Sequence, residues 1–169
     1  MSKEYKNPAL TTDIILFSCE AGVKDRNGCD EQAVQDCNSF SCEEEKDLKV
    51  LLIKRKYEPF KDKWAFPGGF VEYDEELEAA AHRELEEETN IKDICLKQLG
   101  TFGRVGRDPR GRTVSVVYYA FVDNSSKLNV KAQDDAKEVQ WFSVKKLPEL
   151  AFDHSEIMDF ALEKLEIKF

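Results

Sequence analysis

Apolar residues fall in short runs separated by polar stretches. Residues 11–19, TTDIILFSC, are β-branched and apolar and predict a buried strand. Further strands are expected at KVLLIKR (49–55), ICLKQLGTFG (94–103), TVSVVYYAFV (113–122) and EVQWFSV (138–144). The pattern therefore predicts a sheet whose strands come from the whole length of the chain.

Two helices are expected among these strands. Asp74 is a good N-cap, and an apolar stripe at helical spacing follows it. The stripe consists of Leu77, Ala80, Ala81 and Leu85. Asn90 is suited to end this helix because asparagine tolerates the left-handed conformation. A closing helix is expected from about Ser155 to Glu166. One central and one terminal helix with mixed strands favour an α/β (α+β) fold, a sandwich around a mixed central sheet.

Residues 20–47 differ from the rest of the chain. They are polar and acidic and contain an Asn-Gly turn signal, so we expect a long surface insertion between two strands. No internal repeat and no second apolar unit with a linker is visible. The 169 residues therefore predict a single domain, 1–169, carrying a polar insertion at about 20–47.

Composition excludes some classes of function. The chain is 41% apolar and 35% charged, and its net charge of −9 argues against nucleic-acid binding through a broad basic surface. The N-terminus has no apolar run of signal-peptide length, and no stretch approaches the ~20 apolar residues of a membrane span. A small anionic ligand held by local arginines or a metal stays compatible with this charge.

The five cysteines are Cys19, Cys29, Cys37, Cys42 and Cys95. Their odd number, the lack of a C-x-x-C pair and the absence of an export signal favour reduced thiols in a cytosolic protein. Cys29, Cys37 and Cys42 cluster, but their spacings fit no common zinc site. Free thiols in a loop are therefore expected, with a metal site or a disulfide as the alternative.

The predicted helix 74–90 is crowded with glutamates. Glu84, Glu87 and Glu88 stand at i, i+3 and i+4, within an arc of about 100° that also holds the apolar stripe one to two turns earlier. Glu75, His82 and Glu86 fall on the opposite side, where they can be solvated. Three carboxylates on a packed face are expensive unless a positive charge lies among them.

Two interpretations of the acidic face remain. A run of glutamates is most often a solvated helix. A hard divalent cation such as Mg²⁺ would equally relieve the repulsion, because oxygen ligands at this spacing converge. The Gly68-Gly69 turn brings backbone close, and Arg83 could hold one carboxylate by a two-pronged contact.

These residues resemble a known signature. From Gly69 the spacing is five residues to Glu75, seven residues to Arg83-Glu84-Leu85, then Glu87-Glu88 and Asn90-Ile91. This 23-residue stretch resembles the Nudix box, found in hydrolases of nucleoside diphosphates linked to another group. The family usually has glycine at the position of Asn90, and asparagine tolerates the same backbone there.

The resemblance implies a metal centre. Glu84, Glu87 and Glu88 would be metal ligands, with Mg²⁺ as the expected ion and Mn²⁺ as a substitute. The Gly68 carbonyl would complete the shell, Arg83 would orient a carboxylate, and Glu84 is the first choice for general base. Some relatives place that base in a loop outside the box.

Three further stretches resemble the ADP-ribose pyrophosphatase branch of the family. They are KRKYEPFKDKWAFPGGFVE, TFGRVGRDPRGRTVSVVYYAFV and LPELAFDHSEI, and with the N-terminal strand they span most of the chain outside 20–47. The same branch includes regulators of NAD metabolism that carry a DNA-binding winged-helix segment. The sequence ends at Phe169, soon after the closing helix, so no such segment is expected.

The loop between the strands at 94–103 and 113–122 is rich in arginine. Arg104, Arg107, Arg110 and Arg112 are a candidate phosphate clamp, because arginine suits bidentate phosphate contacts. The alternative is a solvated hairpin turn on Asp108-Pro109-Arg110-Gly111. Arg55, at the end of a strand, is a second candidate for substrate contact.

The start of the last helix is ambiguous. Asp153 or Ser155 suits an N-cap and His154 a surface position, whereas the resemblance implies that this turn lines the substrate pocket and makes His154 a substrate residue. Three aromatic residues, Trp64, Phe66 and Phe102, could stack on a base or belong to the core.

The expected function is Mg²⁺-dependent hydrolysis of ADP-ribose to AMP and ribose 5-phosphate. Alternatives are a Nudix hydrolase of other specificity (8-oxo-nucleoside triphosphates or dinucleoside polyphosphates) and a non-catalytic sensor of ADP-ribose or another NAD metabolite. An acidic divalent-ion buffer would leave the glycine turn and Arg83 unexplained. The expected partner is a small nucleotide-sugar substrate, with no nucleic acid and no membrane, in a cytoplasmic protein. Relatives in this branch often form dimers, so we expect a homodimer.

Overall fold

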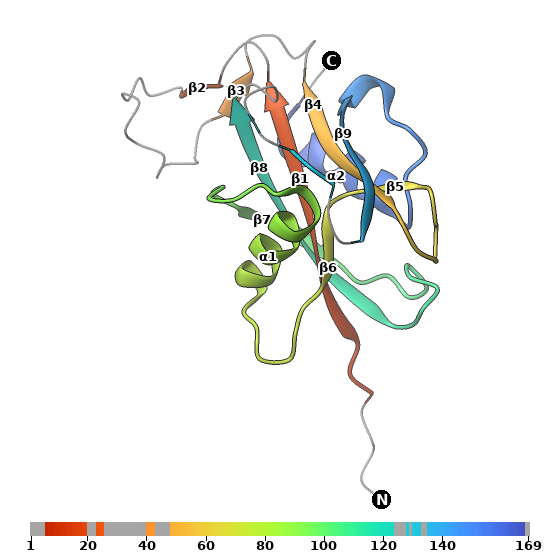
Figure 1. The fold of residues 1–169 in the computed structure, drawn as a ribbon. Helices are drawn as coiled ribbons and strands as arrows, with labels where there is room; N and C mark the ends of the chain where they lie inside the picture. Colours follow the sequence, from red (N-terminus) through yellow and green to blue (C-terminus); the bar gives the residue numbers. More distant parts are fainter. Residues whose placement is uncertain are drawn as a thin grey trace, which may run out of the picture.

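A computed structural model describes residues 6–19, 23–25, 40–42, 48–123, 128, 130–132 and 135–167. The strands are β1 (Ala9–Cys19), β2 (Val23–Asp25), β3 (Phe40–Cys42), β4 (Lys49–Arg55), β5 (Trp64–Ala65), β6 (Gly68–Phe70), β7 (Lys97–Phe102), β8 (Thr113–Asp123) and β9 (Ala136–Ser143). The helices are α1 (Leu77–Thr89) and α2 (His154–Lys164), with a short 3-10 turn at Val144–Lys146. Figure 1 shows α1 and α2 against the long strands.

β1 is the central strand of a seven-stranded mixed sheet, and it changes partner on one edge. It runs parallel to β8 over its whole length, from Ala9 opposite Thr113 to Cys19 opposite Asp123. On the other edge its first half pairs with β6, and only its end, Phe17–Ser18, pairs with β4. β4 and β1 therefore diverge, and the short strands β5 and β6 lie in the opening.

The two faces of the sheet carry two hydrophobic clusters. Ile14 and Leu16 point to the face covered by α1, where they pack with Leu85. Ile15 and Phe17 point to the other face, where they pack with Ile157 and its neighbours on α2. This alternation follows from the period of two along a strand. The predicted α/β/α sandwich around a mixed sheet is confirmed.

Several boundaries differ from the predictions. β4 has the predicted bounds, and Asn90 ends α1 in the left-handed conformation with φ 62°, as predicted. The N-cap is Glu76 rather than Asp74, because residues 73–74 form a turn before the helix begins. α2 begins at His154, so Asp153 is its N-cap residue, although its side chain does not cap the helix.

Two predictions concern the cysteines and the insertion. Cys95 is disulfide-bonded, which contradicts the expectation that all five cysteines are reduced thiols. Most of the predicted insertion at 20–47 lies outside the described residues; the part inside them forms an antiparallel pair of β2 and β3. In the described part of the chain, neither helix is long and apolar enough to cross a bilayer.

Candidate active site

The Pro67-Gly68-Gly69 turn packs so closely that a side chain added at either glycine would meet a neighbouring atom. Gly68 and Gly69 lie opposite Asp13 and Thr12 of β1. A Cβ on Gly68 would lie 2.1 Å from the Thr12 carbonyl oxygen, and φ there is +152°. A Cβ on Gly69 would lie 2.5 Å from the Glu84 carboxylate. The turn therefore brings bare backbone against β1 on one side and against α1 on the other.

Two glutamates of α1 face this turn, one helical turn apart. Glu88 is 6% exposed and accepts a hydrogen bond from the Gly68 N–H at 2.9 Å. Burial raises the pKa of Glu88 to about 8, and burial also raises the pKa of Glu84. Both shifts have the same main cause: burial removes water from the carboxylates and disfavours their charged form.

Arg83 binds more carboxylates than the helical wheel predicted. Its Nε and Nη2 form a fork on Glu75, at 2.8 and 2.9 Å, and Nη1 contacts Glu84 at 2.7 Å and Glu87 at 3.0 Å. The hydrogen bonds from Arg83 to Glu75 lower the pKa of Glu75 to about 2. The expectation of a solvated Glu75 is wrong: the chain between Gly69 and α1 folds back so that Glu75 reaches Arg83.

The acidic face has the oxygen ligands that a hard cation prefers, but these ligands do not surround a single point. Glu84 and Glu88 offer oxygen ligands at i and i+4, next to a backbone with no side chains to obstruct an ion. Glu87 is turned outward toward Arg83, and among the described residues no three acidic, histidine or cysteine side chains converge on one point. The donor set fits a divalent cation, with Arg83 competing for two of its three glutamates.

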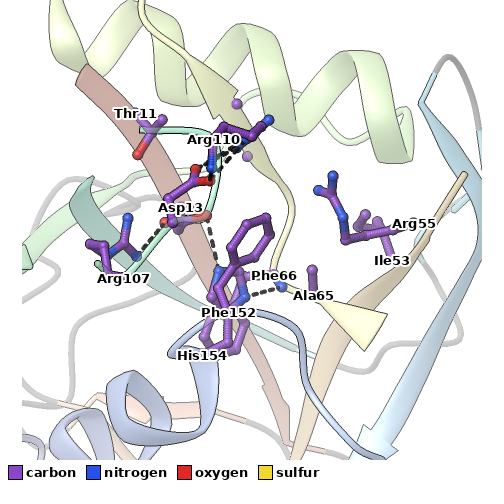
Figure 2. Close-up of a pocket in the computed structure, with 13 residues that line it drawn as sticks. Thr11, Asp13, Ile53, Arg55, Ala65, Phe66, Arg107, Arg110, Phe152 and His154 are labelled. Carbon is purple, nitrogen blue, oxygen red and sulfur yellow. Dashed lines mark hydrogen bonds and ion pairs between the residues drawn. The ribbon is translucent and has the colours of Figure 1, made fainter. Parts of the chain in front are cut away.

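A pocket lies on the other side of the glycine turn, where β1 and β4 diverge (Figure 2). Its walls come from β1, β4, the β5–β6 turn, the β7–β8 loop and the start of α2. The lining residues are Thr11, Asp13, Ile53, Arg55, Ala65, Phe66, Gly68, Gly69, Arg107, Asp108, Arg110, Phe152 and His154. Gly68 and Gly69 are thus shared between the pocket and the acidic face.

Two arginines lie on the Phe152 ring inside this pocket. The Arg55 Cζ is 4.9 Å from the ring centroid, and the Arg110 Cζ is 5.5 Å from it. Asp108 holds Arg110 through Nε and Nη2, and Arg55 donates through Nε to the Pro59 carbonyl. Burial lowers the pKa of Arg55, and the Arg110 charge lowers it further. An anion between these two guanidinium groups would relieve that repulsion.

A buried polar network fixes the β7–β8 loop to α2 and β1. Arg107 donates to both carboxylate oxygens of Asp153, at 2.9 and 2.7 Å, and lies 3.9 Å from Asp13. Ser115 donates to Asp13. Burial opposes the charge on Arg107, but the hydrogen bonds to Asp153 and the field of Asp13 outweigh it and raise the pKa of Arg107. Arg107 is therefore occupied within the protein.

His154 is 3% exposed, at the floor of the pocket. Its Nδ1 accepts a hydrogen bond from the Phe66 N–H at 3.0 Å, and its Nε2 lies 3.5 Å from Asp13 Oδ1. Burial lowers the pKa of His154. Both ring nitrogens thus face protein groups (Figure 2).

The remaining predicted residues lie outside the pocket lining. Arg104 is exposed and pairs with Glu156 on α2. Arg112 donates to the Gly103 carbonyl and shapes the base of the loop. Phe102 packs edge-on against Phe160, and Trp64 packs edge-on against Phe142 in the core. The structure therefore brings together Arg55, Arg107, Arg110 and His154, but not Arg104 or Phe102.

Asp13, Asp108 and Phe152 are among the lining residues that the sequence did not single out. Asp13 carries the clearest missed signal, because an aspartate inside an apolar strand needs a buried partner. The sequence around Asp108 indicates only a hairpin turn, and nothing in the stretch LPELAFDHSEI marks Phe152 as a contact of the arginines. Their functions depend on contacts with distant segments, which spacing along the chain does not reveal.

Comparisons with known proteins identify the family of this chain. The model of the NUDIX domain family matches residues 38–160. The chain is 47% identical over 114 residues to an ADP-ribose pyrophosphatase of Methanocaldococcus jannaschii, covering 68% of this chain and 66% of that protein. It is 33% identical to the ADPR responsive transcriptional repressor NtrR of Acinetobacter baylyi, over 98% of this chain and 57% of the repressor. The chain thus spans less than two thirds of the length of either relative.

A solved structure resembles the fold closely. The NUDIX domain of Shewanella oneidensis NrtR, crystallised with ADP ribose, superposes with a TM-score of 0.70 at 32% identity. The match covers 95% of this chain and 90% of that domain.

Proposed function

Because the chain belongs to the NUDIX family, we propose that it hydrolyses ADP-ribose at the pyrophosphate, giving AMP and ribose 5-phosphate. The observation that carries the proposal is the shared glycine turn. One side of Gly68-Gly69 contacts Glu84 and Glu88, and the other side lines the arginine-bearing pocket. A phosphate chain crossing this turn would lie between carboxylates suited to a cation and guanidinium groups suited to phosphate.

The acidic face would hold the divalent cation, with Mg²⁺ expected and Mn²⁺ able to replace it. Glu84 and Glu88 would be ligands, and Glu87 and the Gly68 carbonyl would complete the set. When bound, such an ion activates water and neutralises charge on phosphate oxygens. Arg83 would hold Glu84 and Glu87 in position, since it already contacts both.

The pocket residues would bind the substrate. Arg110, held at one edge by Asp108, keeps Nη1 for a phosphate oxygen, and Arg55 lies on the same Phe152 ring. Arg107 would act indirectly, by fixing the loop that carries Arg110. Glu84 would accept a proton from the attacking water while the new P–O bond forms and the bridging P–O bond breaks.

The proposal also includes the domain organisation, the oligomeric state and the location of the protein. The protein would be a single Nudix domain with an insertion at about 20–47, a homodimer, and cytoplasmic. The homodimer rests on the resemblance to dimeric relatives, and light scattering on the purified chain tests it directly.

The deciding experiment measures product release from ADP-ribose, NADH, diadenosine tetraphosphate and 8-oxo-dGTP, with Mg²⁺ and again with EDTA. We expect AMP from ADP-ribose to be the fastest product, to vanish with EDTA, and to fall about 10²- to 10⁴-fold in Glu84→Gln. Glu86→Gln is the matched control, because Glu86 is on the same helix but pairs outward with Lys92.

Other outcomes would change the function. A preference for another compound would keep the site and overturn the specificity. Tight binding of ADP-ribose without turnover of any compound would identify a sensor, the class to which the repressor relative belongs.

A further inference from the structure

The segment that leads into α2 is attached to β5 as an additional parallel strand. Trp64 and Leu150 form an isolated parallel bridge, and the Ala151 N–H donates to the Trp64 carbonyl at 2.7 Å. Bonds in a parallel ladder are evenly spaced along the strands. The next bond in this register would run from the Phe66 N–H to the Ala151 carbonyl.

That bond is replaced by one to a side chain. The Ala151 carbonyl instead accepts the N–H of His154 at 3.2 Å, as the chain turns into α2. The Phe66 N–H donates to His154 Nδ1 at 3.0 Å. Phe66 is 1% exposed, so without the imidazole its N–H would be buried beside a carbonyl already in use.

The imidazole is held on three sides. It lies on the Phe66 ring with a centroid distance of 4.8 Å and an interplanar angle of 11°. Because Nδ1 accepts a hydrogen bond, the ring's proton is on Nε2, which faces Asp13 Oδ1 at 3.5 Å. Asp13 is fixed in turn by Ser115. Figure 2 shows His154 between the end of β5 and Asp13 on β1.

The turn that His154 holds is the one that contacts the carboxylates. Phe66 precedes Pro67, whose carbonyl accepts the Ile14 N–H at 2.8 Å, and then Gly68, whose N–H donates to Glu88. Gly68 is also the register partner of Asp13. His154 and Asp13 therefore brace the same turn, one from α2 and the other from β1.

We propose that His154 is a positioning residue, which sets the backbone of residues 66–69 and through it the placement of Glu84 and Glu88. It does this without touching the substrate phosphates, because both of its ring nitrogens are engaged within the protein. This inference rests on the proposed function only for its kinetic readout. Its structural readouts are independent of any activity.

The test is a pair of substitutions that separates the two ring nitrogens. An asparagine side chain places its amide oxygen near the position of Nδ1, so His154→Asn keeps an acceptor for the Phe66 N–H. A glutamine reaches the position of Nε2, so His154→Gln can contact Asp13 but leaves the Phe66 N–H without a partner. Both are polar and of similar size. Ile157→Val, in the buried face of the same helix, controls for loosened packing of α2.

Three quantities are measured on each variant: hydrogen exchange of the Phe66 amide, Mg²⁺ affinity by titration calorimetry, and kcat and KM on ADP-ribose. We expect His154→Gln to lose protection at Phe66, to bind Mg²⁺ about 10- to 100-fold more weakly, and to lose about 10- to 100-fold in kcat with KM nearly unchanged. His154→Asn and Ile157→Val should stay within a few-fold of wild type.

Two results would overturn the positioning role. Equal behaviour of the asparagine and glutamine variants in amide exchange and Mg²⁺ affinity would show that the Nδ1 bond does not set the turn. A rise in KM alone would make His154 a substrate contact instead. If the wild type hydrolyses nothing, the proposed function fails, while amide exchange and Mg²⁺ affinity still decide the role of His154.

Discussion

Alanine at Gly69 should inactivate the site while the fold survives, whereas alanine at Gly68 should destabilise the fold itself. The two glycines are adjacent, but an added methyl group meets different neighbours. At Gly69 it meets the end of the Glu84 side chain, which can swing away. At Gly68 it meets the backbone of Thr12 and Asp13, which is fixed in the pairing of β1 with β6.

The distances set the size of both effects. The new Cβ at Gly69 would lie 2.5 Å from Glu84 Cδ and Oε1, where ordinary contact begins near 3.4 Å. The carboxylate must therefore retreat by about 1 Å, a displacement that can reduce kcat about 100-fold. At Gly68 the clash at 2.1 Å and the positive φ should cost about 1–3 kcal/mol or more. In a chain of this size that lowers the midpoint of thermal unfolding by roughly 2–12 °C.

The assay pairs thermal unfolding with steady-state kinetics on ADP-ribose for both variants and for Gly111→Ala. Gly111 is the control because a Cβ added there would have no neighbouring atom within 4 Å. We expect normal unfolding with low kcat for Gly69→Ala, early unfolding for Gly68→Ala and wild-type values for Gly111→Ala. Wild-type kcat in Gly69→Ala would refute the argument that the glycine exists to make room for Glu84.

Two further predictions concern the pocket. Arg55→Ala and Arg110→Ala should each raise KM for ADP-ribose about 10- to 100-fold, which is the contribution of one charge-assisted hydrogen bond. Arg104→Ala is the control and should leave KM unchanged, because Arg104 is exposed and lies outside the pocket. An equal rise in KM in all three variants would mean that the phosphate binds elsewhere. Burial lowers the pKa of His154, so below about pH 6.5 the unfolded chain takes up a proton before the folded one does. As the pH falls further, the free energy of unfolding should decrease by up to about 1.4 kcal/mol per pH unit until the folded-state pKa of His154 is reached. Urea titrations at several pH values measure this slope, and His154→Asn should remove it. Equal slopes for the wild type and the variant would disprove the prediction.

The sequence was most informative where local chemistry decides the structure. The apolar run KVLLIKR predicted β4 with its observed bounds, and Asn90 predicted the left-handed end of α1. The spacing of Glu84 and Glu88 predicted that both face inward, because one helical turn separates them. These features depend on residues only a few positions apart.

The arginine-rich loop shows why the rest could not be predicted. Arg104, Arg107 and Arg110 are three residues apart and similar in sequence context, yet one is solvated, one is buried against Asp153 and one lies in the pocket. The directions of Arg104 and Arg107 depend on Glu156 and Asp153, which are 52 and 46 residues away at the start of α2, and a loop has no periodicity that fixes its faces. For the same reason the helical wheel missed the contact of Glu75 with Arg83, which requires the preceding turn to fold back.

The register of β1 is what joins the pocket to the acidic face. Thr11 and Asp13 share the parity of Ile15 and Phe17, so they point to the α2 side and line the pocket. Their backbone simultaneously pairs with β6, which presents the glycine turn to α1 on the opposite side. A slip of one residue would turn Asp13 toward α1 and put Ile14 into the pocket. Burying the continuous apolar run Ile14–Phe17 does not by itself select between these registers. Asp13 does, because Ser115, Arg107 and His154 meet its carboxylate only on the pocket side.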